Sequence, residues 1–226
     1  LGGDKMTTRL GRFEMPKHVV RDDEVSTETY GKFYAEPFEG GYGRTMGNSL
    51  RRVLLSSLEG AAVSSVTIKG APHEYCSLDG VKEDVTEIVL NIKKLIFRSY
   101  SRDVQTVKIK VEGPGEVRAG DIVTSDSIEV LNPDFVICNL ADDGVFEAEM
   151  EVRIGRGYCP AELNKKENQK IGIIPVDCLF SPVRRVKYET ENTRVGRQTD
   201  YDKLILEIWT DGRVSPEDAL TMSAAI

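Results

Sequence analysis

The spacing of apolar residues predicts a first helix at about residues 45–58. Apolar side chains recur there at every third or fourth position, which places them on one face of a helix. These residues are Met46, Leu50, Val53, Leu54 and Leu58. Thr45 is a suitable N-cap and Gly60 a suitable end, so the helix is expected to lie between them.

Two further helices are predicted by the same signals. Over about 81–93 the apolar residues follow a 3.6-residue period, and Asp79 or Gly80 is the expected start. The residues of this second apolar face are Val81, Val85, Ile88, Val89 and Ile92. A third helix is expected after Ser215, because serine is a good N-cap, Pro216 suits the first helical position, and two acids follow.

Alternation of apolar and polar residues predicts strands in most of the remaining chain. The expected strands lie at 27–36, where Pro37 would end the strand, at 63–70, at several places between 104 and 155, and at 171–180, 183–189 and 204–209. The last of these is apolar at neighbouring positions, so it is expected to be buried on both faces. The polar segment at 161–170 is expected to form an exposed loop. Helices and strands follow in mixed order, which predicts the α+β class.

Composition and charge then limit the classes of function. The chain has 226 residues, 40% of them hydrophobic and 30% charged, so it is long and apolar enough to form a globular core. It contains no apolar run of the length that crosses a membrane and no apolar signal segment at its start, so we expect a cytoplasmic protein without membrane contact. The net charge of −7 opposes contact with phosphates, and no direct nucleic-acid binding is expected.

Cysteines and histidines give no support for a catalytic or metal site. The four cysteines are widely spaced along the chain and form no C-x-x-C pair; they are Cys76, Cys138, Cys159 and Cys178. Four reduced, partly buried thiols are therefore expected. The two histidines are His18 and His73, no G-x-S-x-G motif occurs, and we interpret His73 as structural.

Three glycines, Gly41, Gly43 and Gly47, stand at the start of the first helix and resemble a phosphate-binding loop. Their spacing is G-x-G-x-x-x-G rather than G-x-G-x-x-G, and no Gly-Lys-Ser or Gly-Lys-Thr occurs in the chain. The preceding strand is partly polar and meets a proline, whereas a dinucleotide site follows a buried parallel strand. We therefore expect no cofactor, and we interpret the glycines as permitting a tight turn and close backbone packing.

A paired arginine, Arg51-Arg52, lies beside the apolar face of the first helix. Arginine is favoured at protein interfaces because its planar guanidinium pairs with carboxylates and stacks on aromatic rings. A partner-binding helix and a core helix with two surface arginines both fit this pattern. The basic clusters at 93–94 and 184–187 lack the interleaved aromatics of an RNA-binding sheet, so they are expected to be solvated or to border a protein contact.

Several segments, in order along the chain, closely resemble the N-terminal assembly domain of the bacterial RNA polymerase α subunit. The most specific is EPFEGGYGRTMGNSLRRVLLSSLEGAAV at 36–63. The others are HEYCSLDGVKEDVTEIVLNIK at 73–93, GPGEVRAGDI at 113–122, GRGYCPA at 155–161, IPVDCLFSPVRRVKYE at 174–189 and TDYDKLILEIWTDGRVSPEDAL at 199–220. The resemblance covers residues 25–226 of the chain.

The resemblance implies two subdomains and a homodimer. A dimerisation subdomain would comprise residues 20–61 and 182–226, with a β-rich subdomain inserted at 62–181 and a flexible leader at 1–19. Two copies would meet through the first helix and the C-terminal helix. The residues expected to divide between the subunit core and the dimer contact are Met46, Leu50, Val53, Leu54, Leu58, Ala219 and Leu220.

In this family the dimer is a non-catalytic platform of a nucleotidyltransferase complex, and the large subunits β and β′ dock on it. The positions implied for β docking are Gly43, Asn48, Arg51 and Arg52, and those implied for β′ docking are Lys93, Cys178, Ser181 and Val183. The expected location is the cytoplasm, with the polymerase on the nucleoid. Two other classes stay open at this point. One is a nucleotide-dependent enzyme that uses the 41–52 segment; the other is a DNA-binding regulator, which the acidic charge opposes.

Overall fold

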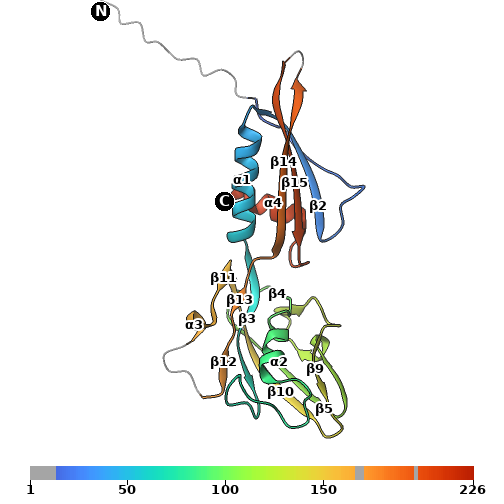
Figure 1. Ribbon diagram of the computed structural model, residues 1–226, viewed down its shortest axis with the longest axis vertical. Coiled ribbons are helices and arrows are strands. Elements are labelled where there is room, and N and C mark those ends of the chain that lie inside the picture. The colour runs from blue at the N-terminus through green and yellow to red at the C-terminus, as the bar shows by residue number, and fades with distance from the viewer. Residues whose placement is uncertain (1–13, 166–170, 196–197) are drawn as a thin grey trace, which may run out of the picture.

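The computed structural model describes residues 14–165, 171–195 and 198–226. Figure 1 shows an elongated molecule in which two bodies follow one another along the long axis. The first body holds a four-stranded sheet with helices α1 and α4, and the second holds a seven-stranded sheet with helix α2. The α+β class predicted from the sequence is confirmed.

The first body is an antiparallel sheet covered by two helices. Its strands follow the order β1 (Val19–Arg21), β2 (Tyr30–Glu39), β15 (Gln198–Thr210) and β14 (Val183–Val195). The helices are α1 (Tyr42–Ser56) and α4 (Pro216–Ala225), and α1 packs against β14, β15 and α4. The main apolar core of this body consists of Phe33, Leu54, Leu58, Val183, Val186, Leu206, Ile208 and Ala219.

Strand β15 is buried on the face that packs against α1, whereas its continuous apolar run predicted burial on both faces. Leu204 and Leu206 are 3% and 2% exposed and pack into clusters that include residues of α1. Ile205 points to the other face, between Tyr34 of β2 and Glu189 of β14, and is also buried. On this second face, however, Glu207 and Trp209 are partly exposed, so the predicted burial holds there for Ile205 but not for its neighbours. An antiparallel sheet can leave one face to water, and here no helix covers that face.

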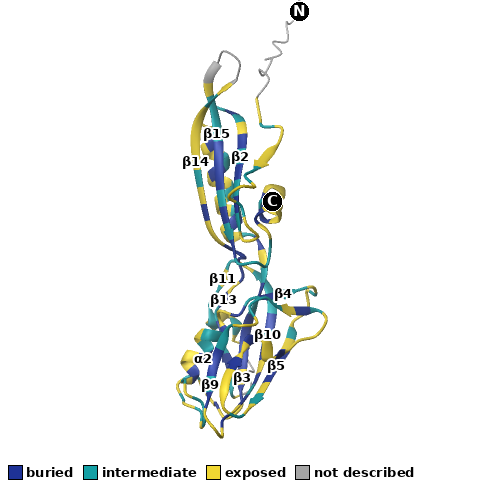
Figure 2. Cartoon of the chain, turned by 90° about the vertical axis from the view of Figure 1, so that its right-hand side faces the viewer, coloured by how far each residue is buried: buried dark blue, intermediate teal, exposed yellow. Residues whose placement is uncertain are grey.

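The second body is built around the larger sheet. Its strands follow the order β7 (Ile122–Val123), β5 (Gln105–Glu112), β10 (Val145–Arg156), β3 (Glu59–Ile68), β4 (Phe97–Ser99) and β8 (Ile128–Val130), and β12 (Ile173–Pro175) also pairs with β3. Two small sheets pair β6 (Gly115–Arg118) with β9 (Val136–Leu140) and β11 (Tyr158–Cys159) with β13 (Cys178–Leu179). The short helices are η1 (Ala119–Asp121) and α3 (Ala161–Asn164). Buried and exposed residues alternate along the strands of this body (Figure 2), so one face of its sheet forms the core.

Helix α1 begins and ends earlier than expected. Gly41 has a φ of 84° and is the N-cap, so Thr45 lies inside the first turn, where its Oγ1 donates to the Gly41 carbonyl. Helix α1 ends at Ser56, and Gly60 lies in β3. A Cβ at Gly60 would lie 2.0 Å from the Phe180 carbonyl oxygen, so this glycine serves a close backbone approach and not a helix end.

Helix α2 (Val85–Ile92) buries Val85, Ile88 and Ile92, the apolar face predicted for it. Its start, however, lies after the expected Asp79 or Gly80. Val81 forms a β-bridge with Leu140, so its backbone is extended and not helical. The helix begins after Asp84.

Pro37 does not end the first long strand. Strand β2 runs through it to Glu39, and the Glu36–Pro37 peptide bond is cis. The pairing with β15 is irregular here, since Ala35 lies opposite Leu204 while Phe38 lies opposite Asp202. Proline has no N–H to donate, and an irregular step in the ladder is where a strand tolerates it.

Parts of two predicted features lie outside the described residues, namely 1–13 of the leader and 166–170 of the polar loop. The end of the expected leader, at Val19, belongs to β1, which pairs with β2. The start of the loop forms α3. Among the helices of the described ranges, none has the length and apolar character needed to cross a membrane.

Candidate functional site

The N-terminus of α1 binds the carboxylate of Asp202. Oδ2 of Asp202, on β15, accepts hydrogen bonds from the backbone N–H groups of Gly41 at 2.8 Å and Gly43 at 3.2 Å. These N–H groups lie at the positive end of the helix, where a phosphate would bind. Asp202 therefore takes the position that a nucleotide phosphate would need, and this contact disfavours a nucleotide site at 41–47.

The glycines of α1 allow the helix to approach the sheet. A Cβ at Gly47 would lie 2.5 Å from Cδ2 of Tyr188 on β14 and 2.9 Å from Cδ1 of Leu204 on β15. A Cβ at Gly43 would lie 2.8 Å from the side chain of Asp202. These contacts support the interpretation of the glycines as packing residues. Gly43 is itself buried, so it does not form part of an exposed docking surface.

Substituting Asp202 with alanine is expected to destabilise the first body. The variant loses two charge-assisted hydrogen bonds to the helix start, which is worth about 1–2 kcal/mol of unfolding free energy. Urea unfolding at one fixed protein concentration would measure the loss. Asp200→Ala removes an exposed carboxylate from the same strand and serves as the matched control; equal losses in both variants would contradict the capping role.

The structure divides the predicted dimer residues into two groups. Leu54, Leu58 and Ala219 are at most 3% exposed and belong to the core of the first body. The second group, Met46, Leu50, Val53 and Leu220, lines an open groove of about 670 Å³ beside α1 and α4. The apolar stripe of α1 therefore faces its own sheet with one edge and the groove with the other.

The groove is largely apolar. Besides the second group, its lining includes Phe33, Ala35, Phe38, Val19, Met15 and Ile226. Several of these side chains are open to solvent: Met15 is 50% exposed, Val19 52% and Ile226 71%. Large exposed apolar surfaces of this kind mark protein contact sites.

A second surface of α1 carries exposed positive charge. Arg44, Asn48, Arg51 and Arg52 are all exposed on this helix. None of the three guanidinium groups has an ion pair within the described residues. Arg44 and Asn48 also border a shallow depression of about 430 Å³ next to Tyr188. Sequence reasoning singled out Asn48, Arg51 and Arg52 and missed Arg44, which lies one helical turn before Asn48.

The residues predicted for the second docking surface are mostly buried. Cys178, Ser181 and Val183 are 1%, 3% and 4% exposed, so their side chains support the segment and do not form a surface. Lys93 reaches solvent, and its Nζ lies 2.7 Å from Oδ2 of Asp177. A contact through Lys93 stays a prediction.

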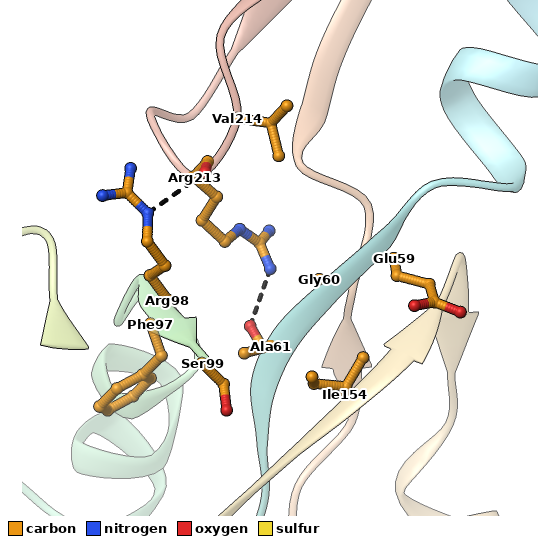
Figure 3. A pocket seen from close by; sticks show the side chains of 9 residues that line it. All are labelled: Glu59, Gly60, Ala61, Phe97, Arg98, Ser99, Ile154, Arg213 and Val214. Carbon is orange, nitrogen blue, oxygen red and sulfur yellow. Dashed lines mark hydrogen bonds between the residues drawn. The ribbon is translucent and has the colours of Figure 1, made fainter. Parts of the chain in front are cut away.

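Arg213 joins the two bodies, a role that sequence reasoning did not find. Its guanidinium donates to the carbonyl of Ala61 on β3 at 2.7 Å (Figure 3). It also donates to the carbonyl of Ser181 at 3.0 Å and pairs with Asp211 at 2.6 Å. The side chains of Arg213 and Asp211 are 6% and 2% exposed. From the other side, Arg98 of β4 donates to the carbonyl of Arg213 (Figure 3) and to that of Gly212. In the sequence, Arg213 stands in a polar turn and resembles a surface arginine.

The cysteines are free, as expected, but two of them are neighbours in space. Cys159 on β11 and Cys178 on β13 lie directly opposite each other, although they are distant in sequence. His73 lies exposed in the segment before α2. The described ranges contain no group of three or more histidine, cysteine or acidic residues that could hold a metal ion.

Comparison with known proteins identifies similar sequences. The family described as the RNA polymerase Rpb3/RpoA insert domain matches residues 66–181, which is the greater part of the second body. The DNA-directed RNA polymerase subunit alpha of Geobacter metallireducens is 52% identical over 211 residues, which cover 93% of this chain and 62% of that protein. The chain thus spans somewhat under two thirds of the length of this curated relative.

Proposed function

Since this chain belongs to the family of bacterial RNA polymerase α subunits, we propose that it is a non-catalytic assembly subunit of DNA-directed RNA polymerase. Two copies dimerise, and the dimer docks the β and β′ subunits. The proposal includes a dimerisation subdomain at 20–61 and 182–226 and an inserted subdomain at 62–181. In this role the chain works in the cytoplasm, within the polymerase on the nucleoid, and contributes no catalytic group.

The observation that carries the proposal is the apolar groove along α1 and α4. The helix that borders it, α1, presents Met46, Leu50 and Val53 to the opening. A second copy can therefore place the same side chains of its own α1 in the groove, and the contact is self-complementary about a two-fold axis. Closure of the groove would remove a large apolar surface from water, the main favourable term in the association of obligate dimers.

Sedimentation equilibrium of the purified chain tests the dimer. We expect a dimer at micromolar concentrations, because contacts of this apolar kind give stable homodimers. A chain that stays monomeric across the concentration range would remove the groove as a dimer contact and, with it, the basis of the proposed platform.

The exposed basic face of α1, with Arg44, Asn48, Arg51 and Arg52, supports docking of β. These three guanidinium groups have no acid partner among the described residues, which favours a contact surface that carries carboxylates or aromatic rings. The two copies in a dimer are chemically identical, so one can hold β and leave the other for β′. The asymmetry then arises on binding.

Substituting Arg52 with alanine is expected to weaken capture of β and leave the dimer intact. A central interface arginine contributes on the order of 1–3 kcal/mol, which corresponds to about 5- to 150-fold in affinity. Co-purification with tagged β, quantified across concentrations, measures the change. Arg102→Ala is the control, since that side chain is 88% exposed on the second body. Unchanged capture by the Arg52 variant would exclude Arg52 from the docking surface.

A further inference from the structure

Cys159 and Cys178 lie opposite each other on a short antiparallel ribbon. In the pairing of β11 with β13, Tyr158 lies opposite Leu179 and Cys159 lies opposite Cys178. Directly opposite residues of an antiparallel pair project from the same face. Tyr158 and Leu179 are 62% and 48% exposed on one face, so the two cysteines share the inner face.

The backbone spacing of this pair suits a disulfide. Opposed residues of antiparallel strands have Cα atoms about 4.5–5.5 Å apart. A disulfide accepts Cα separations of about 4.4–6.8 Å. The pairing of Cys159 with Cys178 therefore falls within the range of a disulfide with the strands in their present register.

Polar groups surround both sulfur atoms. Asn164 of α3 contacts both of them: its Oδ1 accepts from Sγ of Cys159 at 3.3 Å, and its Nδ2 donates to Sγ of Cys178 at 3.3 Å. Nη2 of Arg153 donates to Sγ of Cys159 at 3.1 Å and also to Asn164. Arg153 is held in this position over the ring of Phe180, 5.3 Å from its centroid. A neighbouring guanidinium stabilises a thiolate, the reactive form of cysteine.

The two thiols differ in access. Cys159 is half-buried, whereas Cys178 is 1% exposed and its Sγ donates to the carbonyl of Val63 at 3.2 Å. Burial raises the pKa of the Cys178 thiol. Cys159 is therefore the sulfur that a reagent meets first. Cys138 offers a contrast, since it is fully buried and burial raises the pKa of its thiol to about 12.

We propose that Cys159 and Cys178 form a thiol–disulfide exchange site that reacts with small-molecule disulfides such as oxidised glutathione. The Cys159 thiolate attacks one sulfur of glutathione disulfide, forms a mixed disulfide and releases one glutathione thiol. The Cys178 thiol then loses its proton and attacks the Cys159 sulfur, which releases the second glutathione. The two protein thiols are oxidised to one disulfide, and the glutathione disulfide is reduced to two thiols. The bond joins β11 to β13, the strand that leads into the first body.

Incubation of the purified chain with oxidised glutathione tests the proposal. We expect an intact mass lower by two hydrogen atoms, one linked peptide containing Cys159 and Cys178, and reversal by dithiothreitol. Cys76 and Cys138 should still react with iodoacetamide after unfolding. A stable glutathione adduct on Cys159, a bond that includes another cysteine or another chain, or an unmodified protein would each overturn the proposal.

Variants separate the steps of the exchange. Cys178→Ser should trap the mixed disulfide at Cys159, because the resolving thiol is gone. Cys138→Ser, the matched change of another buried cysteine, should still form the bond. Arg153→Met should slow the first step, because the Cys159 sulfur loses the N–H that donates to it. If Arg153→Met reacts at the unaltered rate, or if Cys178→Ser forms no adduct, the assigned roles are wrong.

Discussion

Substituting Val53 with aspartate is expected to convert the proposed dimer into monomers that keep their secondary structure. Val53 is half-buried and lines the groove between α1 and α4. In the proposed dimer its side chain enters an apolar contact, and the two-fold axis places one new carboxylate from each copy there. An unpaired buried charge costs at least about 3 kcal/mol. Dimerisation should therefore weaken by more than about 100-fold.

The choice of Val53 over its neighbour follows from burial. Leu54 is fully buried in the core of its own chain, so Leu54→Asp would unfold the first body and could not report on the dimer. Leu55 lies on the outer side of α1 and is 36% exposed, so Leu55→Asp adds the same charge away from the groove. Sedimentation equilibrium with circular dichroism on both variants decides the matter. A Val53→Asp protein that dimerises as tightly as Leu55→Asp would place the contact elsewhere.

Substituting Arg213 with methionine is expected to lower the free energy of unfolding more than the Asp202→Ala substitution does. Methionine keeps much of the length of the side chain but removes the donors to Ala61 and Ser181 and leaves the carboxylate of Asp211 buried with less compensation. Removal of one partner of a buried ion pair costs about 3–5 kcal/mol. Arg184 lies 3.6 Å from the same carboxylate and compensates in part, so the low end, about 3 kcal/mol, is expected.

Urea unfolding measures this loss, and Arg184→Met is the matched control. The Arg184 side chain is 46% exposed, so its pairing with Asp211 contributes less than about 1 kcal/mol. The Arg213 variant should also be cut faster by protease where the bodies meet, because the contacts to β3 and to the segment before β14 are lost. Equal stability of the two variants would show that the junction does not depend on Arg213.

The elements that depend on local signals could be predicted from the sequence. Ser215 caps α4 by accepting from the N–H of Asp218, and α2 buries the face that its periodicity indicates. The start of α1 could not be predicted, because it depends on the left-handed conformation of Gly41 and on a carboxylate of β15. A contact between residues 161 positions apart leaves no local pattern for sequence reasoning to use.

The sequence predicts that α1 has an apolar side and a charged side, but not which residues of each side contact which neighbour. The periodicity of α1 identified its apolar stripe, and the paired arginine identified its charged side. Which apolar residues face the chain's own sheet depends on the tilt of α1 over β14 and β15, which no spacing specifies. The role of Arg213 and the meeting of Cys159 with Cys178 depend on strand pairing across long stretches of chain.

Helix α1 has a different neighbour on each of its sides. Gly43 and Gly47 touch the sheet, Leu54 fills the core, Val53 borders the groove, and Arg52 faces outward. A random substitution in α1 should therefore disrupt one of these contacts at almost every position. In a saturation mutagenesis screen for growth, this helix should form one nearly uninterrupted block of intolerance, whereas tolerated changes should recur with helical periodicity along α2.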